Sequence, residues 1–221
     1  CRRYIAGIML GIKVGPSPSW MQERLMAINQ RPINNIVDCA NYVMLELGQP
    51  LHAFDMDKLN PAKIVVRRAK EGEQIVTLDN KEYKLDKSML VIADSGPPAG
   101  GPIAIAGIKG GKKKEIDAKT KKIIIESANF EPANIRKTSQ KMGLRTGASV
   151  GFENEIPSAL AMDAMERVMA LIQETAGGKI VSGKIDFYPK KFKSGRISFD
   201  FKDIANLLGI NIPEKKVLSI L

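Results

Sequence analysis

Two side chains in this sequence have the chemistry of a reactive site. His52 is the only histidine among the 221 residues. Glu126 lies inside the apolar run at residues 123–128, and strand alternation would place it on the same side as Ile124 and Ala128. An imidazole can orient or deprotonate water near neutral pH, and a buried carboxylate needs a partner. Plainer interpretations stay open: a histidine bonded to a backbone carbonyl, and a glutamate on an outward face.

A second group of candidates is basic. Seven lysines crowd one short stretch: Lys109, Lys112, Lys113, Lys114, Lys119, Lys121 and Lys122. They could form a solvated loop that keeps a sheet edge soluble. Alternatively, Lys112, Lys113 and Lys114 could contact the phosphate backbone of a nucleic acid as point charges, without reading its sequence.

The overall charge favours a polyanionic partner for the chain, while both interpretations of the lysine stretch stay open. Lysine and arginine number 34 against 24 acidic residues, so the formal net charge is +10, which suits a polyanionic partner. Hydrophobic residues make up 44% of the chain, enough for a folded core. The two cysteines show no metal-ligand spacing, and no apolar run is long enough to span a bilayer. We therefore expect a reduced, cytoplasmic protein that holds no metal and contacts no membrane.

Familiar catalytic signatures are missing. The glycine-rich stretch at residues 107–112 superficially suggests a phosphate loop, but it does not match GxxxxGK[ST]. No serine occupies a GxSxG turn of the hydrolase type.

The residues that must position His52 form a predicted helix. Ile36, Ala40, Val43 and Leu47 share one helical face, and Gly48 with Pro50 ends the helix just before the histidine. Glu126 belongs to a predicted strand at residues 123–127, and residues 145–153 are predicted to be a loop or an irregular strand.

The remaining pattern mixes strands and helices without a steady alternation. Strands are predicted at residues 4–14, 64–68, 90–94, 103–108, 180–188 and 197–201, with a hairpin at 75–85 and helices at 132–142, 157–176, 204–208 and 213–221. The methionines of the helix at 157–176 lie near one face and are interpreted as core. This pattern predicts an α+β fold, with mixed sheets and packed helices in one domain at residues 1–190. Residues 191–221 are predicted to be a linker and the incomplete start of the next small domain.

Several motifs in this order resemble one enzyme family. They are SPSW at residues 17–20, RPINNIVDCANYVMLELGQPLHAFD at 31–55, TLDN at 77–80, AGIKGG at 106–111, ESANFEP at 126–132 and TGASVGFEN at 146–154. This combination is similar to the beta subunit of bacterial-type phenylalanine–tRNA ligases, and it covers nearly all of residues 1–190. The resemblance implies the editing domain of that subunit, which hydrolyses tyrosine wrongly esterified to tRNA(Phe).

The resemblance also implies roles for single residues. Glu126 would recognise the tyrosine hydroxyl, while His52, Arg31 and Asn41 would hold the ester end, the terminal ribose or the attacking water. The walls beside the ring would be formed by Thr146, Ala148 and Gly107. Lys109, Gly147 and Gly151 depart from the family's usual residues.

The implied partners are tRNA(Phe) and the ligase alpha subunit, in a heterotetrameric parent. ATP and magnesium would serve the parent's synthetic reaction, and no cofactor is expected on this chain. The competing hypotheses are a module of the same subunit that positions tRNA or acts as a scaffold without editing, and a free-standing RNA-binding protein.

Overall fold

The computed structural model describes residues 1–59, 63–96, 100–183, 185–191 and 195–221. Its residues form two compact units, Cys1–Lys190 and Lys191–Leu221. The linker predicted from residue 191 falls partly on residues 192–194, which lie outside the described residues. That residues 1–190 fold by themselves as a domain stays a prediction.

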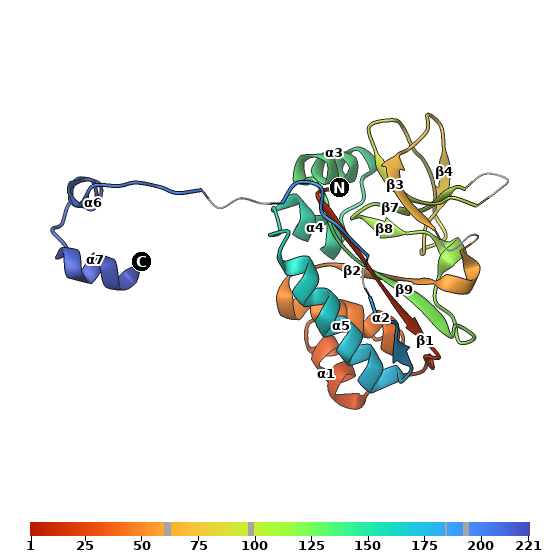
Figure 1. Cartoon of the computed structure of the whole chain (residues 1–221). Coiled ribbons are helices and arrows are strands. Elements are labelled where there is room, and N and C mark those ends of the chain that lie inside the picture. Colours follow the sequence, from red (N-terminus) through yellow and green to blue (C-terminus); the bar gives the residue numbers. More distant parts are fainter. Residues whose placement is uncertain (60–62, 97–99, 184, 192–194) are drawn as a thin grey trace. The chain divides into compact units, whose positions relative to one another are not determined.

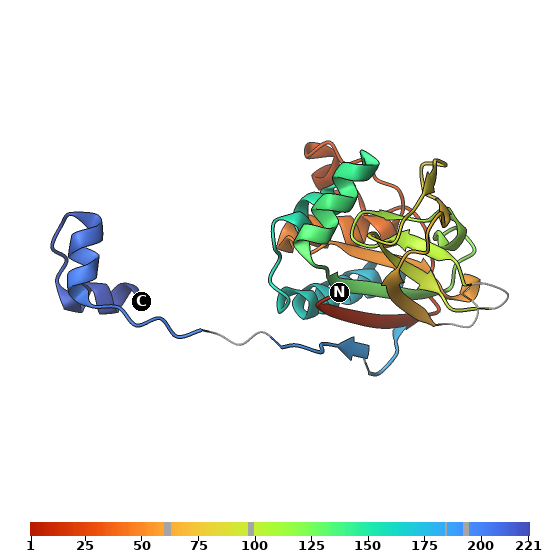
Figure 2. The same ribbon diagram turned by 90° about the horizontal axis from the view of Figure 1, so that it is seen from above.

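The first unit confirms the α+β fold. Its main sheet has the order β10-β1-β9-β2, and β11 also pairs with β1. The bounds of these strands are β1 Arg3–Leu10, β2 Leu51–Asp55, β9 Lys122–Asn129, β10 Lys179–Ile180 and β11 Ile185–Phe187. Strands β1 and β9 pair antiparallel along their whole length and lie side by side in Figure 2, so they form the middle of the main sheet.

A second sheet and a hairpin face the main sheet. The sheet has the order β3-β6-β7-β8, with bounds Ile64–Arg68, Leu90–Asp94, Pro102–Ile105 and Lys109–Gly110. The hairpin pairs β4 Gln74–Val76 with β5 Glu82–Lys84. The short 3-10 turns η1 Met56–Lys58 and η2 Lys112–Lys114 complete this side.

Helices cover the other face of the main sheet. These are α1 Ser19–Ala27, α2 Asn35–Leu47 and α5 Leu160–Ala176, while α3 Pro132–Met142 and α4 Gly147–Glu153 lie at one end (Figure 1). Strand β9 therefore lies between two cores. Ile123 and Ile125 pack into the core that the helices share, whereas Ile124 and Ala128 pack into the core beneath the second sheet. Glu126 follows the parity of Ile124, so it faces the second sheet.

The helix before His52 forms as its spacing predicts. Helix α2 begins after Asn34, whose side chain accepts hydrogen bonds from the Ile36 and Val37 amides. It ends at Gly48, which has a φ of 81° and donates its amide to Met44 at 2.8 Å. The chain then turns directly into β2, which carries His52 at its second position.

The methionines of α5 are core residues, as predicted. Met165 and Met169 are buried against β1. A Cβ atom at Gly7 of β1 would lie 2.8 Å from the Met169 sulfur and 2.9 Å from that of Met165. Gly7 is therefore needed for close packing of the helix on the sheet.

Two predicted elements were wrong. Residues 145–153 are not a loop or irregular strand, because α4 begins after Thr146, whose side chain and that of Ser149 cap it reciprocally. Residues 197–200 form no strand, and Phe201 begins a helix. The second unit instead contains α6 Phe201–Leu208 and α7 Glu214–Ile220. No described helix is both long enough and apolar enough to cross a membrane.

Candidate functional site

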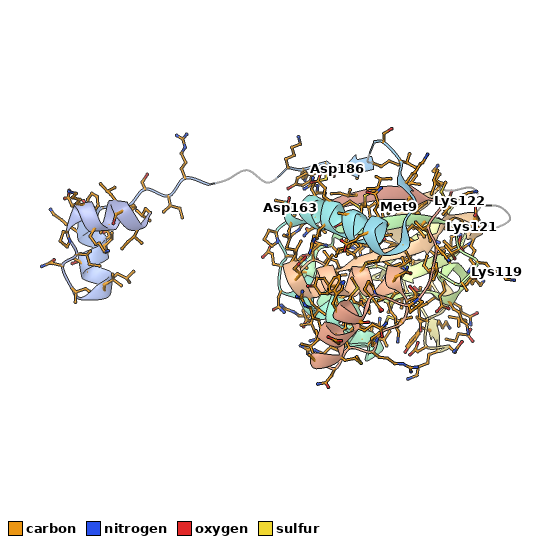
Figure 3. The ribbon with its side chains drawn as sticks, turned by 90° about the horizontal axis from the view of Figure 1, so that it is seen from below. Met9, Lys119, Lys121, Lys122, Asp163 and Asp186 are labelled. Carbon is orange, nitrogen blue, oxygen red and sulfur yellow. The ribbon has the colours of Figure 1, made fainter. Side chains whose placement is uncertain are left out.

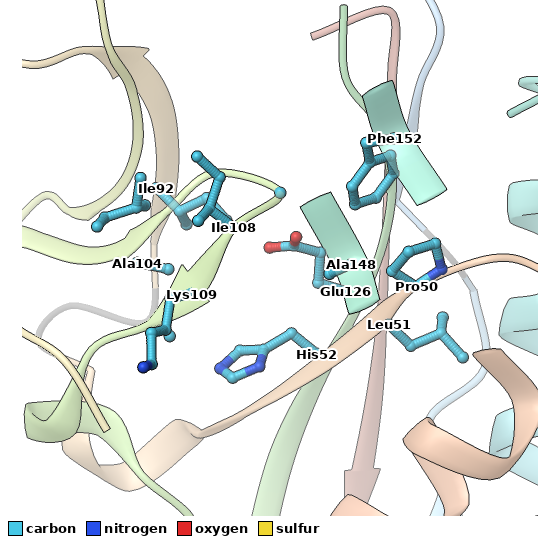
Figure 4. Close-up of a pocket in the computed structure, with 13 residues that line it drawn as sticks. Pro50, Leu51, His52, Ile92, Ala104, Ile108, Lys109, Glu126, Ala148 and Phe152 are labelled. Atoms are coloured by element: carbon cyan, nitrogen blue, oxygen red, sulfur yellow. The ribbon is translucent and has the colours of Figure 1, made fainter. Parts of the chain in front are cut away.

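A cavity lies between the two sheets and α4 (Figure 4). Most of its walls are apolar, and its lining residues are Pro50, Leu51, His52, Ile92, Ala104, Ile105, Gly107, Ile108, Lys109, Gly110, Glu126, Ala148 and Phe152. Four residues predicted for the site are thus brought together: His52, Gly107, Glu126 and Ala148. Segments far apart in the sequence meet here because β2 and β9 are neighbours in the main sheet.

Glu126 is the buried carboxyl of this cavity. Its side chain is turned into the cavity in Figure 4, and only 6% of the residue's surface is exposed. The Tyr4 hydroxyl donates a hydrogen bond to Oε2 of Glu126 at 2.8 Å. Burial raises the pKa of the Glu126 carboxyl to about 7, although the bond from Tyr4 acts in the opposite direction. Burial therefore shifts this carboxyl towards its protonated form relative to an exposed glutamate.

His52 lies directly across from Glu126 on the adjacent strand. Its ring packs edge-on against Phe54, with the ring centroids 4.5 Å apart. Burial lowers the pKa of the His52 imidazole to about 4, so the ring is neutral near pH 7. A neutral imidazole accepts a hydrogen bond at one nitrogen and donates at the other, but with this pKa it removes protons poorly. His52 is better suited to orienting a water molecule than to deprotonating it.

The glycine-rich stretch closes the cavity opposite these two residues. Gly107 has a φ of 68°, and a Cβ atom there would lie 2.9 Å from the Phe130 ring. At Gly110 a Cβ atom would lie 2.7 Å from Cε1 of His52. Gly110 lets the chain approach the imidazole closely, and Gly107 lets it pack against the aromatic rings beside α4, so the stretch shapes a wall of the cavity.

Thr146 supports the cavity without lining it. Its Oγ1 accepts a hydrogen bond from the Ser149 amide at 3.1 Å and donates one to the Ile108 carbonyl at 2.9 Å. These bonds join the start of α4 to the turn after β7. Ala148 in the first turn of α4 then presents its methyl group to the cavity.

The two glycines of α4 that depart from the resembled pattern are not required by the backbone. Neither Gly147 nor Gly151 has a positive φ. A Cβ atom at Gly151 would make ordinary contacts of 3.4 Å with Ile156 and Pro50. The helix would accommodate larger residues at the Cβ level at both positions.

Arg31 and Asn41 are not brought to this cavity. Arg31 is exposed in the segment before α2, and Asn41 is half-buried within α2. Neither belongs to the lining residues. Their predicted roles at the ester end stay predictions.

The lysine-rich stretch is partly neutralised by acidic neighbours. Lys109 pairs with Asp79 at 2.8 Å, and Lys114 pairs with Asp94 at 3.0 Å. Lys122 pairs with Asp57 at 3.0 Å, and Lys112 contacts the Asn80 side chain. Among the described residues, Lys113 has no ion-pair partner, and it is exposed. Figure 3 shows Lys119, Lys121 and Lys122 together at one end of the first unit, away from Asp163.

Sequence reasoning missed most of the residues that line the cavity, among them Lys109, Gly110 and Phe152, and it missed Tyr4, which bonds to Glu126. The sequence marks Lys109 only as basic and as a departure from the resembled pattern, yet it lies at the cavity with its ammonium held by Asp79. Phe152 belongs to the segment predicted as a loop. Tyr4 could have been found only from the pairing of β1 with β9, which a strand pattern alone does not reveal.

The two shifted pKa values predict opposing effects on stability. Glu126 has a raised pKa, so its contribution to the free energy of unfolding is complete below pH 4.5 and is lost as pH rises through 7. His52 has a lowered pKa, so its contribution is full above 6.5 and is lost as pH falls through 4. Between pH 4.5 and 6.5 the two groups therefore change the free energy of unfolding in opposite directions. The slope from each group is at most about 1.4 kcal/mol per pH unit.

Conservative substitutions of Glu126 and His52 should separate their two contributions to the pH dependence of the free energy of unfolding. Relative to the unchanged protein, the free energy of unfolding of Glu126→Gln should rise more steeply with pH over this window, and that of His52→Gln should rise less steeply or fall. Urea unfolding at a series of pH values measures both. Two variants with slopes parallel to that of the unchanged protein would contradict the assigned pKa directions.

Comparison with known proteins finds a matching family and close relatives that together cover the chain. The B3/4 domain family matches residues 1–177. The phenylalanine–tRNA ligase beta subunit of Clostridium acetobutylicum is 48% identical over 217 residues, covering 98% of this chain and 27% of that protein. That of Carboxydothermus hydrogenoformans is 47% identical over 221 residues, covering 100% of this chain and 27% of that protein. The chain spans about a quarter of the length of these relatives.

One solved structure has a similar fold. It is the crystal structure of an N-terminal fragment of the phenylalanyl-tRNA synthetase beta subunit from Pyrococcus horikoshii. The TM-score is 0.51 at 14% sequence identity, over 96% of this chain and 57% of that one. At this identity the likeness concerns the fold alone.

Proposed function

The chain belongs to the B3/4 domain family, and on that premise we propose that its cavity hydrolyses tyrosine esterified by mistake to tRNA(Phe). The resemblance to phenylalanine–tRNA ligase beta subunits is confirmed by relatives that match the chain over its full length. The observation that supports the proposal most is one buried carboxyl, Glu126, beside the His52 imidazole in an apolar cavity. Deacylation of Tyr-tRNA by the intact ligase, with and without Glu126, tests the proposal.

The chemistry of selection follows from the placement of that carboxyl. Phenylalanine and tyrosine differ by one hydroxyl, and an apolar synthetic pocket rejects an added hydroxyl poorly. A second site can select for the hydroxyl instead, because the carboxyl oxygen that Tyr4 does not occupy is satisfied by a phenol and left unpaired by a phenyl ring. An unpaired buried polar group costs about 1–3 kcal/mol, and more when charged. The site therefore favours tyrosine by roughly ten- to more than a hundredfold.

Hydrolysis of the ester requires few catalytic groups from the protein. An aminoacyl ester is already activated, so a positioned water and some stabilisation of the tetrahedral oxyanion are sufficient. The neutral His52 ring can hold such a water by accepting a hydrogen bond from it. Because the pKa of His52 is about 4, we assign it the role of orienting the water rather than that of a strong general base.

Water is the only co-reactant of the editing step, so this chain would need no cofactor, while ATP and magnesium would serve synthesis elsewhere in the ligase. The partners would be tRNA(Phe) and the alpha subunit of a heterotetramer. Since charging of tRNA belongs to protein synthesis, we expect the enzyme in the cytoplasm.

The lysine-rich stretch offers a separate test of contact with tRNA. In η2, Lys114 is paired with Asp94 and Lys112 contacts the Asn80 side chain, whereas Lys113 has neither kind of contact among the described residues, so it is the best placed of the three to meet a phosphate. If it does, Lys113→Ala should reduce the salt dependence of tRNA binding, the slope of log K against log salt falling by about 0.9. Measured affinities at a series of salt concentrations give this slope. Lys137→Ala, an exposed lysine on α3, is the matched control, and equal slopes for both variants would reject the contact.

A further inference from the structure

The two oxygens of the Glu126 carboxyl have different surroundings. Oε2 accepts the hydroxyl proton of Tyr4 at 2.8 Å, and both residues are buried. Among the residues the structure describes, none donates a hydrogen bond to Oε1. The carboxyl group is turned towards the cavity in Figure 4, so a group that enters the cavity meets an acceptor that is not yet occupied.

Strand register explains how a phenol of the protein reaches this carboxyl. In the pairing of β1 with β9, Ala6 lies directly opposite Glu126, and Tyr4 lies opposite Ala128. Tyr4 is thus the diagonal neighbour of Glu126, a separation that an aromatic side chain spans. His52 occupies the corresponding position on the opposite side, on β2.

We infer that Tyr4 is a positioning residue of the site, whose phenol occupies one oxygen of Glu126 and presents the other to the hydroxyl of a tyrosyl substrate. The inference rests on the proposed function. An ionised carboxyl accepts several hydrogen bonds, so it can hold one phenol from the protein and one from the substrate at the same time. The contact also fixes the rotamer of Glu126 before the substrate arrives, which reduces the ordering cost of binding.

Tyr4 also influences the charge of the acceptor. A donor to the carboxylate favours its ionised form, so the bond from Tyr4 holds the pKa of Glu126 below the value that burial alone would impose. The other titratable groups that face Glu126 are His52 from β2 and Lys109 from β8, and the latter is paired with Asp79. Neither is hydrogen-bonded to the carboxyl in the described structure. Weakening the Tyr4 bond should therefore keep Glu126 protonated to higher pH.

The test compares hydrolysis of Tyr-tRNA and Phe-tRNA by the full-length ligase across a range of pH. In the unchanged enzyme, the preference for Tyr-tRNA should increase with pH through a midpoint close to the pKa of about 7. In Tyr4→Phe, the preference at pH 7 should fall about three- to tenfold, the loss of one net hydrogen bond, and the midpoint should move to higher pH. Tyr83→Phe, a half-buried tyrosine of β5 in the same core, is the matched control and should change neither quantity.

A second substitution moves the profile in the opposite direction and retains the packing. With 3-fluorotyrosine at position 4, the phenol is more acidic and a stronger donor, so the midpoint should move to lower pH. Shifts of the pH midpoint in opposite directions in the two variants cannot arise from packing alone. If Tyr4→Phe fails to fold, the 3-fluorotyrosine variant alone still tests the role of Tyr4.

The outcomes separate this inference from the proposed function. If Glu126→Ala abolishes the preference for Tyr-tRNA while both Tyr4 variants retain the original midpoint and preference, the role of Tyr4 is overturned and editing stands. If Glu126→Ala leaves the preference intact, the proposed function fails and the role of Tyr4 fails with it. Shifts in opposite directions, with Tyr83→Phe unchanged, support the inference.

Discussion

Tyr-tRNA(Phe) should accumulate when Glu126 is replaced by alanine in the intact ligase, while synthesis of Phe-tRNA stays near normal. The substitution removes the acceptor that satisfies the phenol in the cavity, so hydrolysis of Tyr-tRNA should slow by roughly ten- to more than a hundredfold. The measurement is deacylation of isolated Tyr-tRNA, together with the aminoacylation rate for phenylalanine.

Controls for this variant are available in the same chain. Glu174→Ala removes an exposed acid from α5 and should leave deacylation unchanged. Glu126→Gln keeps the size of the side chain but loses its charge, so it should retain part of the selectivity. Unchanged deacylation in Glu126→Ala would reject editing at this cavity and favour the alternative of a module that positions tRNA or acts as a scaffold.

His52→Ala should slow hydrolysis more than it weakens binding of the tyrosyl end. The imidazole lies across the strand pair from Glu126, where it can hold the attacking water, and it does not itself contact the carboxyl through a hydrogen bond in the described structure. Misplacement of that water should lower kcat about a hundredfold with a small change in KM. Single-turnover deacylation, with binding of a non-hydrolysable analogue measured separately, distinguishes the two effects.

The nature of the His52 contribution can be resolved by a milder substitution. Glutamine at this position can still hydrogen-bond a water but cannot act as a base, so recovery of activity in His52→Gln would support orientation of the water. Equal losses of binding and of rate in His52→Ala would instead point to a purely structural histidine.

Local patterns in the sequence predicted the elements that carry the site. The spacing of the apolar residues from Ile36 to Leu47 marks one face of α2, and Gly48 marks its end, because both signals are local. The alternation of β9 placed Glu126 with Ile124 and Ala128, and the structure confirms that this face is buried. The pattern could not decide that the face was inward, because this depends on the second sheet packing over it.

What the sequence could not supply was pairing between distant strands. The register that places His52 opposite Glu126, and Tyr4 diagonal to it, depends on the order of strands in the sheet. Helix α4 was missed because Gly147 and Gly151 lower helix propensity, while its capping box uses Ser149 where glutamate or glutamine is usual. The position of the cavity depends on both features.

The central claim concerns one contact, between a substrate phenol and the free oxygen of a buried acid. A crystal structure of the protein with a non-hydrolysable tyrosyl-adenosine analogue tests it most directly. We expect the phenol oxygen within hydrogen-bonding distance of Oε1 of Glu126, with Tyr4 still bonded to Oε2 and the ester-equivalent group near His52. An analogue bound elsewhere, or one whose phenol points away from Glu126, would contradict it.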